Sequence, residues 1–112
     1  MKRVIRFRAV DRQIFLDIKN RNKTVETRAG TVKYRNLDSG DTLVFVCGKE
    51  RFEKKVKKAR RARTPAALLR FYSFKKIRPD LKTKDEFIKS YDSFPGYKEK
   101  IKKFGLIAME LK

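Results

Sequence analysis

The sequence predicts a small α+β protein: a compact β-barrel of about five strands with three to four short flanking helices. Two observations lead to this fold class. Five segments have the apolar spacing or composition of strands, and other segments begin with residues that commonly cap helices. At 112 residues, of which 40% are hydrophobic, the chain is large enough for one modest core. We therefore expect a single domain over residues 1–112.

A strand over residues 3–9 is expected first, because apolar residues stand two positions apart between arginines. A helix follows, for which Asp11 is a candidate N-cap. Its apolar stripe recurs every four residues, at Val10, Ile14 and Ile18. The segment NRN, residues 20–22, is expected to end the helix, since asparagine tolerates the left-handed conformation that helix ends often need.

The segment RNKTVETR, residues 21–28, is predicted to form the next strand, and it carries both charge signs in a chain that is mostly basic. Side chains alternate along a strand, so if Val25 points into a core, Glu26 and Arg28 share the opposite face. Lys23 lies just before them. These mixed charges make the segment the first candidate for a chemical site.

Two further strands are expected around a hairpin. LDSGD, residues 37–41, has the Ser, Gly and Asp of a turn, and the apolar DTLVFVC after it is the clearest strand of the chain. GKE then predicts a hairpin loop into residues 51–63. Those residues fit either a helix or a strand, and the hairpin favours the strand. One face of that strand would carry Phe52, Lys54, Val56 and Lys58.

Helices are expected in the last part of the chain. Thr64 is a candidate N-cap, with Pro65 at the first helical position. Thr83 with Glu86 three residues later forms a capping box before a second helix. GYKEKIKKFG predicts a third helix that stops at Gly105, and LIAMEL closes the chain as a strand.

The composition excludes several kinds of chemistry. There is no histidine and only one cysteine, Cys47, so an internal disulfide, a zinc site within the chain and a histidine-based triad are excluded. We expect no metal and no cofactor. No apolar run approaches the about 20 residues of a membrane-spanning helix. We expect a soluble, cytoplasmic monomer with no membrane partner.

The net charge of +19 comes from 32 Lys and Arg against 13 Asp and Glu, and it indicates a polyanionic partner. Nucleic acid is the favoured partner, with RNA preferred over DNA. The alternative is a charged surface adapted to heat. Heat adaptation usually adds glutamate together with lysine, whereas acidic residues are scarce in this chain.

The positive charge is densest in residues 49–63, which we call the basic ribbon, where nine basic and two acidic side chains give a net charge of +7. Side chains on one side of a strand are spaced by about 6.6–6.8 Å, so an extended ribbon could follow the phosphates of a nucleic acid. The candidate phosphate contacts are Lys54, Lys55, Lys57, Lys58, Arg60, Arg61 and Arg63.

Aromatic residues near the basic ribbon could stack on bases. Tyr34 and Tyr72 are the better candidates, because a hydroxyl lets the ring sit at a wet boundary. The phenylalanines are expected in the core instead, since buried phenylalanine is the norm. These are Phe52, Phe71 and Phe74.

Taken in order, these segments resemble the ASCH domain family, small barrels related to the PUA fold. The signature of that family is Gly-x-Lys-x-x-Glu-x-Arg, where the first helix meets the next strand. RNKTVETR supplies Lys23, Glu26 and Arg28 in register, with Arg21 in place of the glycine. LDSGDTLVF is similar to the Gly-Asp turn of the family, FYSF to its aromatic-rich helix end, and YKEKIKKFGLIAMEL to its closing helix and strand. The likeness covers nearly the whole chain and is closest to short, stand-alone archaeal members.

The resemblance implies binding of RNA or a nucleotide-like ligand in a cleft lined by the signature. Lys23 and Arg28 would contact phosphate or a base carbonyl, and Glu26 would hold Arg28 or accept from a base amino group. Alternatively, the three residues pair with one another and only brace the barrel. An exposed pair contributes only about 0–1 kcal/mol, so bracing alone explains the cluster poorly.

The resemblance also leaves room for an enzyme, because one branch of the family is similar to amidohydrolases that act on acetylated cytidine with a lysine and a threonine three residues later. Lys23 matches that pattern, but Glu26 stands in the threonine position, and Thr24 and Thr27 are out of register. Ribonuclease activity in other relatives could use Lys23 with a hydroxyl. The candidates for that hydroxyl are Tyr72 and Ser73.

Three functions therefore stay open at this point. The first, which we favour, is an RNA-binding barrel that uses the basic ribbon and the cleft. The second is a hydrolase acting on RNA or a modified nucleoside, centred on Lys23 and Glu26. The third is a non-specific DNA-binding protein that acts through charge alone.

Overall fold

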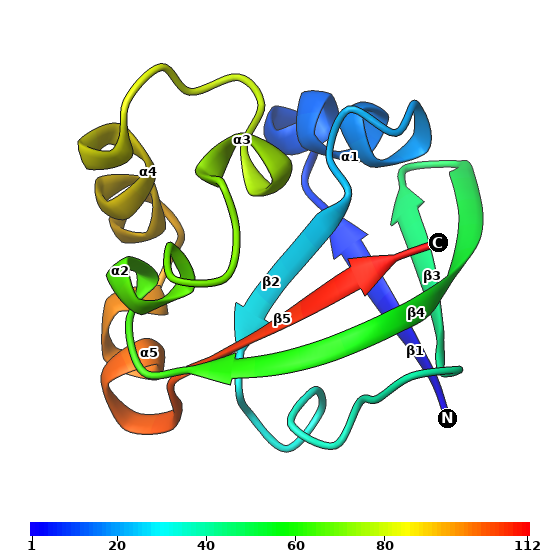
Figure 1. The fold of residues 1–112 in the computed structure, drawn as a ribbon. Helices are drawn as coiled ribbons and strands as arrows, with labels where there is room; N and C mark the ends of the chain where they lie inside the picture. The colour runs from blue at the N-terminus through cyan, green and yellow to red at the C-terminus, as the bar shows by residue number, and fades with distance from the viewer.

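A computed structural model describes residues 1–112 as a curled sheet of five strands with short helices around it (Figure 1). The strands are β1 (Lys2–Phe7), β2 (Val25–Ala29), β3 (Thr42–Cys47), β4 (Glu50–Ala62) and β5 (Leu106–Leu111). The α-helices are α1 (Arg12–Lys19), α2 (Pro65–Leu68), α3 (Phe74–Ile77), α4 (Lys84–Ser90) and α5 (Tyr97–Phe104). Short 3-10 turns lie at Ala9–Asp11 and Tyr91–Ser93. The predicted α+β class with five strands is confirmed, with five short helices where three to four were expected.

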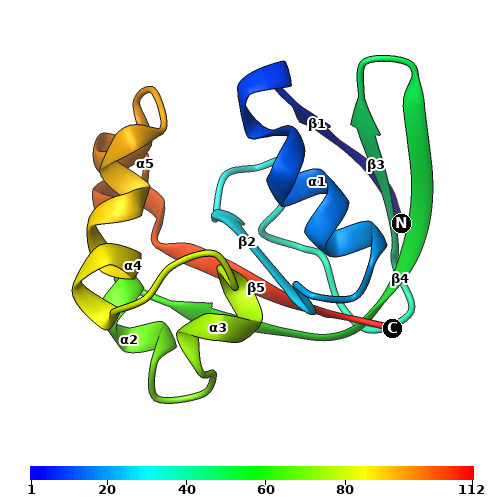
Figure 2. The same cartoon turned by 90° about the horizontal axis from the view of Figure 1, so that it is seen from above.

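The sheet is a half-barrel that stays open along one line. Its strand order is β1-β3-β4-β5-β2, so β1 and β2 are the two edges and do not pair with each other. β1 runs parallel to β3, and the other neighbours are antiparallel. Seen from above, α1 lies between the β1–β3 side and the β2–β5 side (Figure 2). We call the unpaired gap between the two edge strands the seam.

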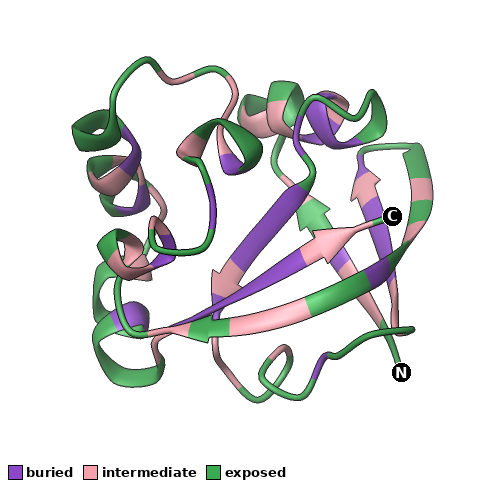
Figure 3. Ribbon diagram, viewed as in Figure 1, coloured by how far each residue is buried: buried purple, intermediate pink, exposed green.

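Two hydrophobic clusters hold the fold together, one on each face of the β2–β5 part of the sheet. The first lies inside the curl beneath α1 and contains Phe15, Ile18 and Phe45. The second lies between the sheet and the helices α2 to α5. β5 supplies both, because Ile107 and Met109 belong to the first cluster and Leu106 and Ala108 to the second. Figure 3 accordingly shows β2 and β5 largely buried and β4 mostly accessible.

Local capping signals give most helix starts correctly. The Thr64 hydroxyl accepts from the Ala67 N–H at 3.2 Å, and the Thr83 hydroxyl accepts from the Glu86 N–H at 3.1 Å. The first helix is different. Val10 lies in the 3-10 turn before α1 and is 79% exposed, so its predicted place in the apolar stripe is wrong. The Asp11 carboxylate accepts from Arg8 Nε at 2.8 Å and makes no cap hydrogen bond.

The turn after α1 uses a left-handed residue, but not an asparagine as predicted. Arg21 has a φ of 65°, whereas Asn20 has a φ of −90°. Arg21 therefore adopts the backbone conformation for which glycine is best suited. A non-glycine residue held in this region costs about 1–3 kcal/mol.

Replacing Arg21 by glycine is therefore expected to raise the free energy of unfolding by about 0.5–1 kcal/mol, since the relief of strain exceeds the added freedom of the unfolded chain. Urea unfolding at pH 7 measures the change. Lys19→Gly is the matched control, because Lys19 is an exposed helical residue and glycine there should cost about 1 kcal/mol. Equal losses in both variants would contradict a strained Arg21.

Candidate functional site

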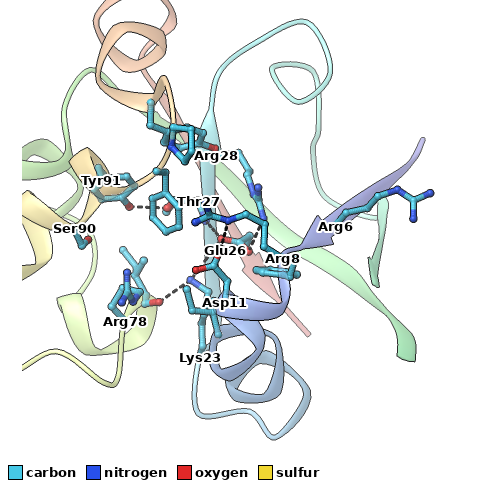
Figure 4. Close-up of a pocket in the computed structure, with 16 residues that line it drawn as sticks. Arg6, Arg8, Asp11, Lys23, Glu26, Thr27, Arg28, Arg78, Ser90 and Tyr91 are labelled. Atoms are coloured by element: carbon cyan, nitrogen blue, oxygen red, sulfur yellow. Dashed lines mark hydrogen bonds and ion pairs between the residues drawn. The ribbon is translucent and has the colours of Figure 1, made fainter. Parts of the chain in front are cut away.

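A cavity of about 230 Å³ lies at the seam, between the edge strands β1 and β2. Figure 4 shows the residues around it, which come from the end of β1, the start of α1, β2, the end of α3 and the segment of residues 90–97. Cavities for drug-sized ligands have volumes of about 300–1,000 Å³. This smaller cavity suits a single compact group.

The turn after α1 delivers Lys23 into the cavity. The backbone N–H groups of Asn22 and Lys23 both donate to the Asp17 carbonyl oxygen, at 2.9 Å each. The turn is thereby fixed, and the Lys23 side chain is only 2% exposed. Its Nζ donates to the Ile77 carbonyl oxygen at 2.6 Å. A long cationic side chain is thus held inside the protein by few partners, which is unusual for lysine.

Glu26 lies between two cations. Its Oε1 is 3.5 Å from Lys23 Nζ, and its Oε2 is 3.7 Å from Arg28 Nη2. Oε1 also accepts from the Thr27 backbone N–H at 2.7 Å. Glu26 and Arg28 point to the face of β2 opposite to Val25, as the strand alternation predicts. The signature residues are brought together, and Lys23 and Glu26 form a buried pair, so the weak energetics of an exposed ion pair do not apply to them.

Two atoms of this group are buried without any hydrogen-bond partner, namely Glu26 Oε2 and Arg28 Nε. Buried polar atoms are normally paired, and each unpaired one costs about 1–3 kcal/mol. The first is an acceptor and the second a donor. A planar ligand with an amino group beside a ring nitrogen or carbonyl on one edge, as in a nucleobase, has the complementary pair of groups, and the two side chains would turn towards the cavity to reach it.

Aromatic rings form the other walls. Arg28 Cζ lies 5.2 Å from the centroid of the Phe7 ring, so a β2 side chain packs on a β1 side chain across the seam. At the edge of the cavity, Arg8 Cζ lies 6.0 Å from the centroid of Phe94. The ring of Tyr97 is 5.7 Å from that of Phe94. Flat rings and guanidinium groups favour a flat ligand.

Two tyrosine hydroxyls contact β2 beside the cavity. Tyr91 Oη and Thr27 Oγ1 share a hydrogen bond of 2.6 Å, and Tyr97 Oη accepts from the Ala29 N–H at 3.2 Å. Burial raises the pKa of both tyrosines, so both hydroxyls are neutral at pH 7. The Tyr97 hydroxyl and the Glu26 carboxylate accept from the backbone N–H groups of Ala29 and Thr27, which would otherwise be open to pairing with another chain at this sheet edge.

The ionisation of Lys23 is set by its surroundings. Burial lowers the pKa of Lys23, and the Glu26 carboxylate opposes this shift only in part. Arg28 and Arg78 lower it further by charge repulsion. Lys23 therefore loses its proton more readily than an exposed lysine does. Lysines that act as bases or nucleophiles share this property.

The basic ribbon lies along β4, but a β-bulge changes which residues share a face. The register with β5 shifts between Val56 and Lys58, so Lys58 turns to the face opposite to Val56. The prediction that Lys58 lies on the face of Phe52 and Val56 is therefore wrong, and Ala59 packs on that face instead.

The predicted phosphate contacts of the ribbon differ in accessibility. Lys55, Lys57, Lys58, Arg61 and Arg63 are exposed, and Arg60 is half-buried. Lys54 is the exception, because it lies opposite the core residue Leu43 on the inner face, and burial lowers its pKa. Lys54 is thus poorly placed to contact phosphate together with the others. No ribbon residue lines the cavity.

The structure does not bring the predicted hydroxyl candidates to the cavity. Tyr72 is buried, its hydroxyl donates to Glu110 Oε2 at 2.7 Å, and it is therefore unsuited to stack on a base. Ser73 caps α3 through the Lys75 N–H at 3.3 Å. Tyr34 is half-buried, with Lys33 Nζ 5.1 Å from its ring centroid. None of Tyr34, Tyr72 and Ser73 lines the cavity.

Several cavity residues escaped the sequence analysis. They are Arg6, Phe7, Arg8, Arg78, Ser90, Tyr91, Phe94 and Pro95, and Tyr97 was considered only as a helix residue. One signal was available in YDSFPGY, residues 91–97, where aromatic residues recur every three positions beside Pro and Gly. Exposed loops rarely need three aromatic rings, so this segment could have been identified as a candidate wall.

The donor set gives no indication of a metal centre, since no group of three or more His, Cys, Asp or Glu side chains is suitably placed to hold an ion. None of the helices combines the length and apolar character needed to cross a membrane.

Comparison with known proteins gives structural relatives. No family model matches the chain, and no curated protein does. The crystal structure of the hypothetical protein PH0355, from Pyrococcus, is similar with a TM-score of 0.83 and 26% identity, over 100% of this chain and 98% of that one. The NMR structure of protein PF0455 from Pyrococcus furiosus is similar with a TM-score of 0.74 and 28% identity, over 100% of this chain and 96% of that one. The half-barrel fold therefore has archaeal relatives of nearly the same length.

Proposed function

We propose that this protein binds single-stranded RNA, with one base or nucleoside in the seam cavity and the backbone on the basic ribbon. The observation that carries the proposal is the unpaired acceptor Glu26 Oε2 beside the unpaired donor Arg28 Nε, in a cavity with aromatic walls. A base held in a duplex cannot enter such a cavity, so an unpaired base is favoured. The exposed cations of β4 and the net charge of +19 supply the sequence-independent attraction to phosphate. The resemblance to the ASCH family supports the same assignment.

Labelled single-stranded RNA, single-stranded DNA and duplex DNA of one length, titrated over 50–300 mM salt, test this proposal. Lys23→Met/Glu26→Gln is the test variant, because it removes both charges and leaves no buried ammonium without a carboxylate. We expect it to lose the preference for RNA, by about tenfold, since a good base-edge contact discriminates by about 1–3 kcal/mol. The salt slope should stay near −3.5, as expected if five exposed cations each neutralise one phosphate of a single strand.

The matched control for this titration is Lys2→Met/Glu53→Gln, which removes an exposed ion pair of 3.4 Å outside the cavity. We expect this control to keep the preference for RNA. If all three nucleic acids bind alike and both double variants match the wild type, the cavity does not read bases. Equal affinity for duplex DNA would then favour the DNA-binding alternative.

A hydrolase acting on a modified nucleoside is the second candidate, and the lowered pKa of buried Lys23 favours it. The hydroxyl of Thr27, which lines the cavity, hydrogen bonds to Tyr91 and has no hydrogen bond to Lys23. A nucleophile and its base need such a contact, or one that forms with substrate, so binding is preferred to catalysis. Turnover of N4-acetylcytidine that is abolished by Lys23→Met would reverse this preference.

A further inference from the structure

Phe71, in the turn between α2 and α3, is an exposed aromatic residue beside the basic ribbon. It is 50% exposed, although phenylalanines are normally buried. Arg60 of β4 packs on it, with Cζ 4.8 Å from the ring centroid. The prediction that Phe71 belongs to the core and Tyr72 to a wet boundary is thus the reverse of what the structure has.

The surroundings of Phe71 are fixed by a network beneath it. Glu110 of β5 lies 3.8 Å from Arg60 Nε and accepts from the hydroxyl of Tyr72 at 2.7 Å. The buried Tyr72, which follows Phe71 in the chain, anchors the turn. Glu110 holds Arg60 against the Phe71 ring from the side of the sheet. An ordered platform loses less conformational freedom when it binds than a mobile side chain does.

Positive charge surrounds the exposed part of the ring. Arg70 and Lys84 lie with Phe71 around a shallow hollow in the surface. On β4, the bulge places Lys58 and Arg60 on one face, the face of Glu110. A row of cations thus leads along the strand to the aromatic ring, and the ring is a flat apolar surface in an otherwise cationic region.

We propose that Phe71 is a base-stacking platform for a single-stranded nucleic acid whose phosphates contact Lys58, Arg60 and Arg70. This inference rests on the proposed function and adds a second base site outside the seam cavity. Stacking of a base on an aromatic side chain tolerates any sequence, and phosphate contacts give no sequence choice. The platform therefore contributes affinity for single strands, and the cavity contributes selectivity.

Phe104 provides a comparison for this assignment. It is 41% exposed, and Lys103 Nζ lies 5.2 Å from its ring centroid. That cation is the preceding residue on the same helix, so the contact is local. The cation at Phe71 comes from a different element, β4, and is itself held by Glu110.

The absence of tryptophan from the sequence allows a direct test by fluorescence. Phe71→Trp introduces a single indole at the platform, and Phe104→Trp introduces one at the comparison site. We expect a mixed-sequence 12-nucleotide RNA to quench the fluorescence of Phe71→Trp and to leave that of Phe104→Trp nearly unchanged. Inorganic polyphosphate, which has the charges without the bases, should bind both variants without quenching.

Phe71→Leu gives a second readout that does not depend on an added fluorophore. We expect it to weaken binding of the RNA by about 5- to 100-fold and to leave the affinity for polyphosphate and the salt slope unchanged. Because the side chain is half exposed, the variant should fold, and its thermal unfolding verifies this. Phe104→Leu should bind RNA like the wild type.

The outcomes separate the two proposals. Normal RNA binding by Phe71→Leu, without quenching in Phe71→Trp, would overturn the platform and leave the seam cavity standing. If Lys23→Met/Glu26→Gln loses the preference for RNA and RNA quenches the fluorescence of Phe71→Trp, both sites are supported. Absence of RNA binding by the wild type at 50 mM salt would overturn the proposed function and the platform together.

Discussion

Glu26→Gln is expected to lower the free energy of unfolding by about 3–5 kcal/mol, measured by urea unfolding at pH 7. Glutamine keeps the length of the side chain and an oxygen that accepts from the Thr27 N–H. The loss of stability is therefore due to the removal of the negative charge. Without the carboxylate, the Lys23 ammonium stays buried with the Ile77 carbonyl as its hydrogen-bond partner. Arg28 loses its ion-pair partner as well.

The double variant Lys23→Met/Glu26→Gln is expected to lose less stability than Glu26→Gln alone, because no buried ammonium is left without a counter-charge. Glu53→Gln is the control, since Glu53 pairs with Lys2 on the exposed surface and should change stability by at most about 1 kcal/mol. A loss in Glu26→Gln no larger than that in Glu53→Gln would contradict a buried charge pair.

The pH dependence of Glu26→Gln gives an independent check. Lys23 has an ordinary pKa of 10.5, and burial lowers it in the folded protein. Between the two values, the unfolded chain holds a proton that the folded chain has released, so stability rises with pH. Loss of Glu26 lowers the folded pKa further and widens this interval. Glu26→Gln should therefore recover stability from pH 7 towards pH 10 more than the wild type does.

Gly105→Ala is the other substitution with a large expected effect, a loss of about 3 kcal/mol in the free energy of unfolding. Gly105 joins α5 to β5 with φ 70° and ψ −161°, a region that is nearly restricted to glycine. A Cβ at this position would come within 2.9 Å of the Ala62 carbonyl oxygen. Backbone strain and steric overlap therefore add, and the end of β4 would have to move.

Gly48→Ala gives the cost of a positive φ without steric overlap. Gly48 also has a positive φ, 59°, but nothing lies within 4 Å of a Cβ built there. Strain alone should cost about 1 kcal/mol. Thermal unfolding of the two variants side by side measures the difference. If Gly105→Ala is no less stable than Gly48→Ala, the close approach of Gly105 to β4 is refuted.

Features of the fold that depend on a few neighbouring residues were predictable from the sequence. The caps at Thr64 and Thr83 and the stop at Gly105 are local, because each is decided within one helical turn. The strands β3 and β5 follow from their apolar composition. The half of the cavity on β2 was also predictable, since alternation along a strand decides which residues share a face with Glu26.

The remaining features depend on contacts between distant segments. That β1 and β2 face each other across the seam is a tertiary property, so no single segment could show that Arg8 lies beside Phe94 and Tyr97, although the aromatic spacing of residues 91–97 was visible. After the bulge at Lys57, the side chains of β4 point to the faces opposite to those that simple alternation predicts. The composition of this lysine-rich segment does not indicate that one residue is left out of the pairing. Tyr72 is buried and Phe71 exposed, the reverse of the prediction, because Glu110 gives the tyrosine hydroxyl a hydrogen-bond partner inside the protein.

The open seam also makes melting temperature a sensitive means of finding ligands. The two walls of the cavity belong to strands that do not pair, so a molecule bound between them supplies contacts that a closed barrel would already have. A ligand present at about 100 times its Kd adds about 2.7 kcal/mol. For a chain of 112 residues, each kcal/mol raises Tm by about 4 °C. A panel of bases, nucleosides and nucleotides can therefore be ranked without a label, a known sequence or an assay of turnover.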